Sequence, residues 1–339
     1  TLFPKTITPV DVANHVAPHL KGKLVRLDSG DWLVNTGGVL KPANTEAVKT
    51  AITAAIKPAI HEFELSITHL ESEKGKNDAT AKLNRLKSLG WLDKAIHPLG
   101  NHHDISARSS DLDPPNVINF LNGAFDLNGK PQPDALCTRQ ANIEFDPDAN
   151  EHPIFDRFMD WVLPDASATT LLQAVAHGLR GECNSQSLWL IEGHGANGKS
   201  VFFLCIGGIF GDYVANPSSD LLFTRKNGNG EANEDKFLLN GARVAAFSEG
   251  LDGKELNAQR IKELTGDDPI SARRLYGHMV KFRNTAELFL MTNHPTALQA
   301  NDSGLRRHIR PSKLPHTGSQ EEHDAGLATK LLEDGPAIA

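Results

Sequence analysis

The sequence has 339 residues, 39% of them hydrophobic and 23% charged, which is typical of folded domains and excludes disordered and fibrous proteins. Its length favours two units with separate cores over a single domain. The net charge of −7 argues against a nucleic-acid-binding surface spread over the whole chain.

Signals for membranes and secretion are missing from the sequence. The longest apolar run, residues 201–210, is much shorter than the roughly 20 residues of a membrane span, so we expect no membrane partner. The cysteines Cys137, Cys183 and Cys205 lack disulfide or metal spacing, as is typical of a reducing compartment. The chain begins at Thr1 without a leader. We therefore expect a cytoplasmic protein and a segment cut from a longer chain.

Residues 1–110 are predicted to form a mostly helical amino-terminal domain. Residues 23–40 alternate between apolar and polar positions around glycines, which predicts a small hairpin. Residues 43–63 have apolar residues at helical spacing behind a capping residue, so we expect a helix that Pro58 interrupts. The polar stretch at 71–80 is expected to be a loop.

His102, His103 and Asp104 place three potential metal ligands in a row. Adjacent residues rarely point at one ion, and the sequence holds no second ligand cluster. We therefore expect a polar loop here and no metal site.

Residues 111–182 are predicted to be a linker with a short β-hairpin and a helical lead-in. Residues 117–133 carry Asn-Gly turn signals between apolar residues, which favours two short strands. Residues 152–182 carry two helical patterns that Pro164 separates.

Residues 183–312 change in character to short, fully apolar runs separated by helices and loops. The runs within 187–192, 243–249 and 287–293 suit buried parallel strands, so we expect an α/β nucleotide-binding core. The remaining residues, 313–339, are expected to be a truncated carboxy-terminal segment.

The motif G-x-x-x-x-G-K-[ST] occurs without a mismatch between the first of these runs and a helix-like stretch. Its glycines let backbone N–H groups converge on phosphate oxygens, and the helix start adds a positive dipole end. Lys199 would neutralise the β- and γ-phosphates of ATP, and Ser200 would ligate Mg²⁺. The residues expected to bind the nucleotide are Gly193, Gly195, Ala196, Asn197, Gly198, Lys199, Ser200 and Val201.

Polar residues end the other two runs. Glu249 follows the second run, where a carboxylate can orient the attacking water or hold Mg²⁺ through water. Asn293 ends the third run, where an amide can sense the γ-phosphate. Arg306 and Arg307 come later, and an arginine planted across a subunit boundary can stabilise charge on the transferring phosphoryl group. Taken alone, each of these is also ordinary surface or turn chemistry.

Residues 270–310 hold seven basic and two acidic residues, a local net charge of +5 in an acidic protein. On charge alone, a channel for a polyanion and a solvated surface explain this equally well. The basic segment at 261–282 also contains Tyr276 and Gly277, which suits a hairpin that touches a phosphate backbone.

Taken in order, these motifs resemble those of superfamily 3 helicases. More closely, they resemble the phage and plasmid primase-helicase family that includes the satellite-phage primase and the poxvirus primase-helicase. The matching stretches within residues 122–309 are NGAFDL, HPIFDRFMDWVLPD, EGHGANGKSVF, GARVAAFSE, IKELTGDDPISARRLY, LFLMTNHPT and DSGLRRHI. The first hundred residues resemble the family's amino-terminal helicase-associated domain. Ser248 departs from the pattern, since many superfamily 3 members have a second acid there.

The resemblance implies an AAA+-like P-loop NTPase core that assembles into a ring, usually a hexamer, around single-stranded DNA. ATP bound at subunit interfaces would drive translocation and the unwinding of forked duplex DNA. The full-length bacteriophage or mobile-element chain can also carry a primase or polymerase domain. By position, the resemblance assigns catalytic roles to Lys199, Glu249, Asn293, Lys262 and either Arg306 or Arg307. It assigns DNA contacts to a hairpin with Arg273, Arg274, Tyr276, His278 and Lys281.

Two other functions stay open from the sequence. One is a different P-loop ATPase, such as a packaging motor or an AAA+ remodeller, with a protein substrate. The basic hairpin argues for nucleic acid instead. The other is a non-catalytic scaffold that binds nucleotide or DNA. The phosphate loop, its acid and its asparagine are all intact, and a scaffold without ATPase activity would be expected to lose some of them.

Overall fold

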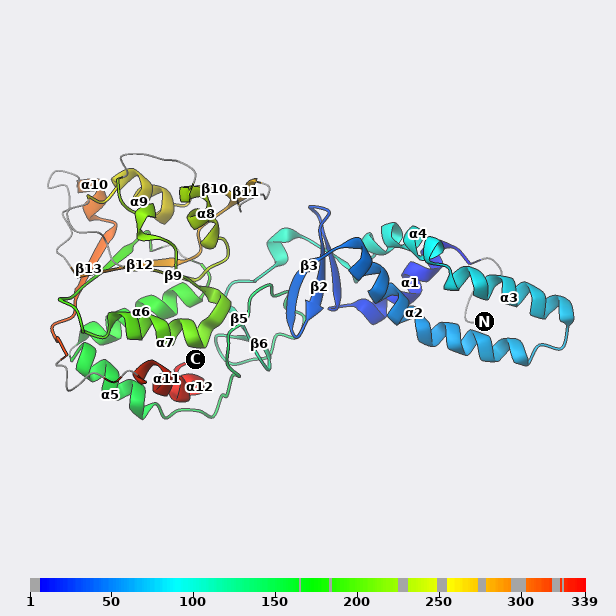
Figure 1. Cartoon of the computed structure of the whole chain (residues 1–339), viewed down its shortest axis with the longest axis horizontal. Coiled ribbons are helices and arrows are strands. Elements are labelled where there is room, and N and C mark those ends of the chain that lie inside the picture. Colours follow the sequence, from blue (N-terminus) through cyan, green and yellow to red (C-terminus); the bar gives the residue numbers. More distant parts are fainter. Residues whose placement is uncertain are drawn as a thin grey trace. The chain divides into compact units, whose positions relative to one another are not determined.

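The computed structural model, drawn in Figure 1, divides into two compact units. Unit 1 comprises Thr1–Pro114 and Asp134–Thr138, and unit 2 comprises Pro115–Pro133 and Arg139–Ala339. The structure describes residues 7–164, 166–182, 185–224, 231–248, 255–273, 279–293, 303–318, 324 and 326–339. Within these ranges, no helix combines the length and the apolar character needed to cross a membrane.

Unit 1 is built on an antiparallel meander, to which a short further strand is added. The strands of this sheet lie in the order β3 (Val39–Ala43), β2 (Trp32–Thr36), β1 (Leu24–Leu27) and β4 (Ser106–Ala107). Neighbouring strands of the meander are antiparallel, whereas β4 runs parallel to β1. The predicted hairpin is confirmed, and a turn at Gly37 and Gly38 extends it by a third strand.

Helices pack beside this sheet. They are α1 (Pro9–Leu20), α2 (Thr45–Thr68), α3 (Glu73–Lys87), α4 (Leu89–Gly100) and the 3-10 turn η1 (Ser109–Asp111). Their buried residues recur at helical spacing, such as Val12 and Val16 of α1 and Ile52 and Ile56 of α2, and they cluster with Trp32 of the sheet. Unit 1 therefore has a hydrophobic core of its own.

The prediction that Pro58 interrupts the second helix is wrong, since α2 continues through it to Thr68. Pro58 is exposed, whereas Ile56 and Ala59 beside it are buried in the core of unit 1. The buried face holds the helix together where the proline removes one backbone hydrogen bond.

The prediction of a loop at residues 71–80 is also wrong, because α3 begins at Glu73. The hydroxyl of Ser72 accepts a hydrogen bond from the N–H of Gly75 and caps the first turn. Only a narrow stripe of this helix, which includes Leu83 and Leu86, is buried. The sequence is polar here because most of the helix surface is solvated, and this hides the helical period.

Unit 2 contains a parallel sheet. Its described strands lie in the order β13 (Ile309–Lys313), β7 (Leu188–Glu192), β12 (Glu287–Thr292), β9 (Val244–Phe247) and β8 (Val214–Ala215), and each pairs in parallel with its neighbours. The apolar runs of the sequence are the central strands β7, β12 and β9. The prediction of an α/β fold with buried parallel strands is therefore confirmed. Strand β13 forms at the edge without an apolar run, since little of it is buried.

Helices cover both faces of this sheet, as Figure 1 shows for α6 and α7 on one face and α9 on the other. Along β12, Leu288 and Leu290 belong to one hydrophobic cluster, and Phe289 and Met291 belong to the cluster on the opposite face. The helices and 3-10 turns of unit 2 are α5 (Pro153–Val162), α6 (Ala166–Leu179), α7 (Lys199–Phe210), η2 (Gly211–Tyr213), η3 (Ser219–Leu221), α8 (Glu231–Leu238), α9 (Ala258–Thr265), α10 (Ser303–Arg306), α11 (Leu327–Leu331), η4 (Leu332–Asp334) and α12 (Gly335–Ile338).

Short antiparallel hairpins complete unit 2. They pair β5 (Val117–Phe120) with β6 (Gly123–Asp126) and β10 (Ile270–Arg273) with β11 (Met279–Phe282). The first hairpin turns at Asn122, whose side chain exchanges hydrogen bonds with the backbone of Phe145. The predicted pair of short strands around an Asn-Gly turn is confirmed.

Candidate functional site

The phosphate-loop motif follows directly on β7, and its last two residues, Lys199 and Ser200, begin α7. Strand β7 lies between β12 and β13, and the chain reaches β13 only after it has built the other side of the sheet. The loop therefore lies outside the carboxyl end of a parallel strand, where the direction of strand addition reverses. This is the usual place of a ligand in an open α/β sheet.

The backbone of the loop has an uncommon conformation. Gly195, Ala196 and Gly198 have φ angles of +93°, +45° and +80°, and such angles are rare for alanine. A Cβ atom on Gly198 would also lie 2.6 Å from Val162 of α5, so this position needs glycine for packing as well. Residues in sparsely populated backbone conformations cluster at ligand sites.

Lys199 points into the loop and is only 6% exposed. Its ammonium donates hydrogen bonds to Oδ1 of Asn197 at 2.8 Å, to Oδ1 of Asn293 at 2.8 Å and to the carbonyl of Gly193 at 3.2 Å. The structure thus brings together the lysine of the motif and the asparagine that ends β12. These three acceptors are uncharged, and a phosphate group in the loop would add the negative charge that an ammonium binds most strongly.

Asn197 lies inside the loop and is 3% exposed. Its amide nitrogen Nδ2 is buried without a hydrogen-bond partner within the described part of the chain. A Cβ atom on Gly193 would clash with this nitrogen, so the glycine makes room for the amide. The motif allows any residue at this position, so sequence reasoning assigns Asn197 to the loop but predicts no role for its side chain.

The segment after β13 supports the loop from outside the motif. The N–H of Gly318 donates to the carbonyl of Ala196 at 2.7 Å. The rings of Trp161 and His316 stack with their centroids 6.1 Å apart, and a Cβ atom on Gly318 would lie 3.3 Å from Trp161. Sequence reasoning missed these residues, because no motif links them to the loop.

The predicted Mg²⁺ ligands are only partly placed. Ser200 is exposed in the first turn of α7, and Val201 after it is half-buried. Glu249 lies outside the described residues. Strand β9 pairs with β12 and ends at Phe247, so its carboxyl end points to the same side of the sheet as the loop.

Arg306 and Arg307 lie towards the amino-terminal ends of the strands, whereas the loop lies at their carboxyl ends. Both are exposed at the end of α10, just before β13. Ile309 pairs with Leu188, the first residue of β7, whereas the loop follows the last residue of that strand. The structure therefore does not bring the arginines to the loop of their own chain. Lys262 is exposed on α9.

Arg273 and Lys281 are exposed on one face of the β10–β11 hairpin. Ser271 pairs with Lys281, and Arg273 pairs with Met279, so the four side chains share this face. Met279 is 58% exposed, which places an apolar side chain in solvent beside the two cations. The other predicted DNA contacts lie outside the described residues: Arg274, Tyr276 and His278.

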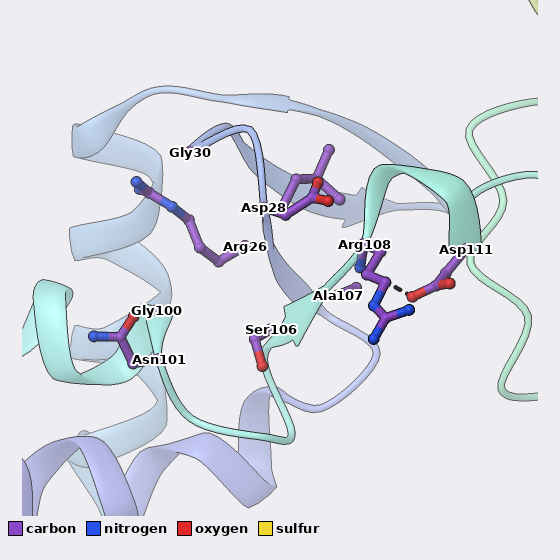
Figure 2. Close-up of a pocket in the computed structure, with 10 residues that line it drawn as sticks. Arg26, Asp28, Gly30, Gly100, Asn101, Ser106, Ala107, Arg108 and Asp111 are labelled. Carbon is purple, nitrogen blue, oxygen red and sulfur yellow. Dashed lines mark hydrogen bonds between the residues drawn. The ribbon is translucent and has the colours of Figure 1, made fainter.

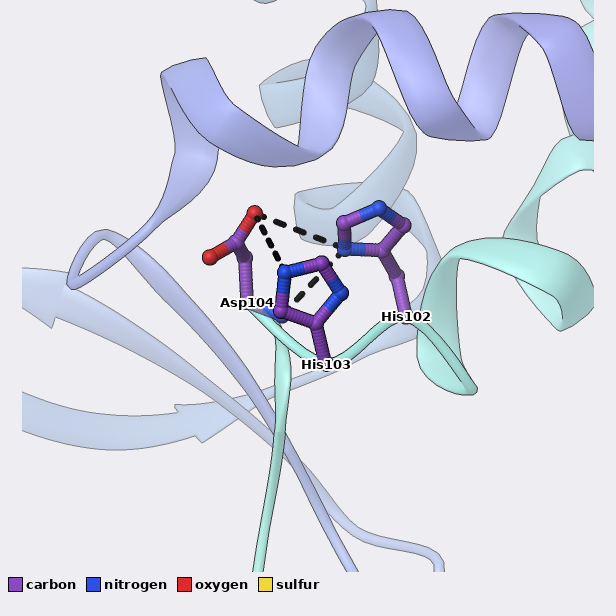
Figure 3. A group of neighbouring side chains, drawn as sticks. All are labelled: His102, His103 and Asp104. Carbon is purple, nitrogen blue, oxygen red and sulfur yellow. Dashed lines mark hydrogen bonds and ion pairs between the residues drawn. The ribbon is translucent and has the colours of Figure 1, made fainter.

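The side chains of His102, His103 and Asp104 converge, as Figure 3 shows, with their ligand atoms within 4.8 Å of one another. The expectation that these neighbours point apart is wrong. The two imidazole rings stack at 4.4 Å between centroids, and Nδ1 of His102 accepts a hydrogen bond from the N–H of Asp104 at 3.2 Å. Oδ2 of Asp104 also lies 3.6 Å from Nδ1 of His102 and from Nε2 of His103, so these residues form a polar turn, as the sequence predicts, whose side chains contact one another.

A pocket of about 600 Å³ lies in unit 1 beside β1 and β4, and the end of α4 at Gly100 and Asn101 also lines it (Figure 2). Asp28 accepts hydrogen bonds from the hydroxyl and the N–H of Ser109, which lower the pKa of the Asp28 carboxyl. Asp111 accepts from the N–H of Arg108. The acids of this pocket therefore hold a turn in place, and we assign no catalytic chemistry to it.

Two family models match parts of this chain, and together they reach into both units. The family model described as D5 N terminal like matches residues 19–164. The model described as a family of unknown function, DUF5906, matches residues 191–307.

Curated relatives come from large DNA viruses. The chain is 29% identical over 202 residues to L207/L206 of Acanthamoeba polyphaga mimivirus, provisionally named a helicase, and the match covers 57% of this chain and 21% of that protein. It is 28% identical over 124 residues to C962R of African swine fever virus, provisionally named a primase, with 36% and 13% covered. The resemblance to viral primase-helicases is confirmed. The matched part of the chain spans about a fifth or less of the length of these relatives.

Solved structures have a fold similar to that of this chain. The A form apo structure of the C-terminal region of NrS-1, residues 305–718, has a TM-score of 0.58 at 11% identity, and the likeness covers 98% of this chain and 68% of that one. A further A form apo structure of the C-terminal region of NrS-1 has a TM-score of 0.57 at 12% identity. At such identities the likeness concerns the fold alone.

The candidate nucleotide and DNA residues all lie within one of the two family matches. The DUF5906 match begins at the end of β7 and includes the loop, Asn293 and both arginines. The D5 N terminal like match covers most of unit 1, the β5–β6 hairpin and α5. The candidates for the nucleotide site therefore lie within the region that a single family model matches.

Proposed function

We propose that the chain is the ATP-dependent helicase module of a replication primase-helicase. Unit 2 binds ATP with Mg²⁺ and hydrolyses it, and hydrolysis drives movement along single-stranded DNA and the unwinding of forked duplex DNA. The observation that carries this proposal is the contact between Lys199 and Asn293. Lys199 belongs to a complete phosphate-loop motif that follows β7, and Asn293 directly follows β12. Relatives named for helicase and primase function support DNA as the polymer.

The residues at the loop fit ATP and Mg²⁺. We assign unit 2 to the P-loop NTPases, in their AAA+-like superfamily 3 form. Lys199, which is buried and aimed into the loop, binds the β- and γ-phosphates. Ser200 and, through water, Glu249 hold Mg²⁺, which supplies positive charge to the phosphates when bound. Asn293 positions the attacking water, and Glu249 accepts its proton.

The arginines favour a ring of several copies. Arg306 and Arg307 are exposed towards the amino-terminal ends of the strands, opposite to the loop of their own chain. An arginine finger at this place therefore serves the loop of a neighbouring copy. Lys262, exposed on α9, is a second cation for such an interface. We infer a homo-oligomer, as a hexamer by analogy with the resembled family.

The β10–β11 hairpin suits single-stranded DNA. Arg273 and Lys281 supply cations for the phosphate backbone, and the exposed Met279 of β11 supplies apolar surface for a base. Positive charge confined to one segment of an acidic chain favours a narrow DNA path over a broad basic surface.

The deciding experiment measures ATP hydrolysis per chain against protein concentration, with and without single-stranded DNA. We expect the rate to rise with concentration, because each site needs a neighbour, and to rise again with DNA. Release of a labelled strand from a forked duplex then tests unwinding. A rate indifferent to concentration and DNA contradicts the proposal. Stimulation by protein substrates alone would favour a remodeller.

A further inference from the structure

We propose that the side-chain amide of Asn197 donates a hydrogen bond to the terminal phosphate of the bound nucleotide, so that the loop recognises the triphosphate with a side chain as well as with its backbone. This inference rests on the proposed nucleotide site. It concerns a group to which the phosphate-loop motif assigns no chemistry, since the motif permits any residue at this position.

The first observation is the unsatisfied donor. Asn197 is 97% buried, and its Nδ2 has no partner among the described residues. Buried amide nitrogens in native proteins almost always have an acceptor, and each exception requires an explanation. An acceptor that arrives with a ligand provides one.

The second observation is where this donor lies. Oδ1 of the same amide accepts a hydrogen bond from the ammonium of Lys199 at 2.8 Å. Lys199 is the residue that binds the β- and γ-phosphates in a phosphate loop, so the amide borders the position of those phosphates. Oδ1 and Nδ2 belong to one small planar group, so a turn of the amide brings Nδ2 to the position beside the ammonium that Oδ1 now occupies.

The third observation is the space reserved for the amide. A side chain on Gly193 would clash with Nδ2, although the φ of Gly193 is not among the positive values that demand glycine. The glycine that opens the motif therefore serves the packing of Asn197. The two residues together keep a neutral donor beside the lysine without adding a second positive charge.

The chemistry of the donor defines the ligand. An amide N–H offers a hydrogen bond but no charge, so it favours an oxygen with spare lone pairs, such as a phosphoryl oxygen. Before nucleotide binds, the ammonium of Lys199 is bonded to the oxygens of Asn197 and Asn293. Once a terminal phosphate competes for that ammonium, the amide can turn and present Nδ2 to the same group.

The test compares the full chain with its Asn197→Ala and Asn197→Asp variants by calorimetric titration with Mg²⁺ and either the non-hydrolysable analogue adenylyl imidodiphosphate or ADP. We expect Asn197→Ala to weaken the triphosphate analogue about tenfold or more and ADP by less than about threefold, because only the former carries the contacted phosphate. Asn197→Asp keeps the size of the side chain but replaces the donor with a negative charge, so it should weaken the analogue more than the alanine variant does.

Thermal unfolding of all three proteins separates contact from packing. Equal losses of affinity for the analogue and for ADP would show that Asn197 only shapes the loop, and unchanged affinity for both would show no phosphate contact. Either result overturns this inference while the nucleotide site of the parent stands. Binding of neither nucleotide by the parent chain would instead remove the proposed function itself. If the alanine variant does not fold, Asn197→Ser takes its place, and equal losses of affinity for the analogue and for ADP again overturn the inference.

Discussion

The ammonium of Lys199 lies 2.8 Å from the amide oxygen of Asn293, which joins the phosphate loop to the tip of β12. The two residues are 94 positions apart in the sequence. They meet because β7 and β12 are adjacent parallel strands, and the carboxyl ends of such strands lie at one edge of the sheet. Nucleotide bound in the loop would therefore contact two strands at once.

Replacing Lys199 with alanine should remove the main cation of the loop. We expect nucleotide affinity to fall by at least about 100-fold and ATP hydrolysis to be lost, because a charge-assisted contact with phosphate disappears. Calorimetric titration with ADP and the triphosphate analogue measures the first effect. Lys313→Ala is a matched control, since Lys313 is exposed and its described ion pair, with Glu192, is long at 4.0 Å. Normal turnover in the Lys199 variant would contradict the assignment of the loop.

Asn293→Ala should separate binding from chemistry. The loop and Lys199 remain, so we expect affinity for the triphosphate analogue to change by less than about fivefold, while the turnover rate falls by about 100-fold. The physical reason is that the amide acts on the attacking water and on the γ-phosphate rather than on the whole nucleotide. Steady-state kinetics provide the check. A large rise in KM with an unchanged kcat would show that Asn293 only helps to bind the nucleotide.

The strands around this site could be predicted because their signals are local. Each of β7, β9 and β12 lies in an apolar run that leads into polar residues, and the glycine-rich motif marks the run after which we propose the phosphates bind. The parallel arrangement follows from burial on both faces. The motif therefore predicts where the proposed nucleotide site lies on the α/β sheet, without any information on long-range contacts.

The contacts that support the site could not be predicted in the same way. Gly318 reaches the backbone of Ala196 from 122 residues away, and nothing in the sequence around either residue signals the pairing. The same holds for the stacking of Trp161 on His316. The helix α3 could not be predicted for a different reason, since the polar composition of a solvated helix resembles that of a loop. Tertiary packing determines whether such a polar segment is helical.

The β10–β11 hairpin should contribute to DNA binding through Arg273 and Lys281. We expect alanine at either position to weaken binding of labelled oligothymidylate about five- to tenfold at moderate salt and to reduce the slope of log affinity against log salt by about 0.7. Fluorescence anisotropy at several salt concentrations measures both. Arg310→Ala is the control, because Arg310 is an exposed arginine of the same basic segment but lies on β13. Equal effects in all three variants would indicate non-specific attraction without a hairpin contact.

Cys205 should be unreactive in the folded chain. Burial, with a smaller contribution from the nearby charge of Asp334, raises the pKa of the Cys205 thiol to about 12. Only the thiolate is alkylated, so at pH 8.5 the folded protein offers almost none of the reactive form. Iodoacetamide treatment and peptide mass analysis should find Cys205 unmodified in the native chain and modified in about 6 M guanidinium, which unfolds the protein. Equal labelling under both conditions would show that α7 opens readily.

Asp334 should stabilise α5 from the far end of the sequence. Its Oδ2 accepts the N–H groups of Ile154 at 2.7 Å and Phe155 at 2.8 Å, in the first turn of a helix whose own capping residue makes no such bond. Asp334→Ala leaves both donors without their acceptor and removes a negative charge from a helix amino terminus. We expect unfolding free energy to fall by about 2 kcal/mol.

Urea unfolding followed by circular dichroism measures this loss, and Glu333→Ala is the control, since Glu333 is the exposed acidic neighbour of the buried Asp334. The consequence should reach the phosphate loop, because α5 carries Val162, which packs against Gly198. Nucleotide affinity of the Asp334 variant should therefore fall together with its stability, whereas the Glu333 variant keeps both. Equal stability of the two variants would mean that α5 does not depend on this cap.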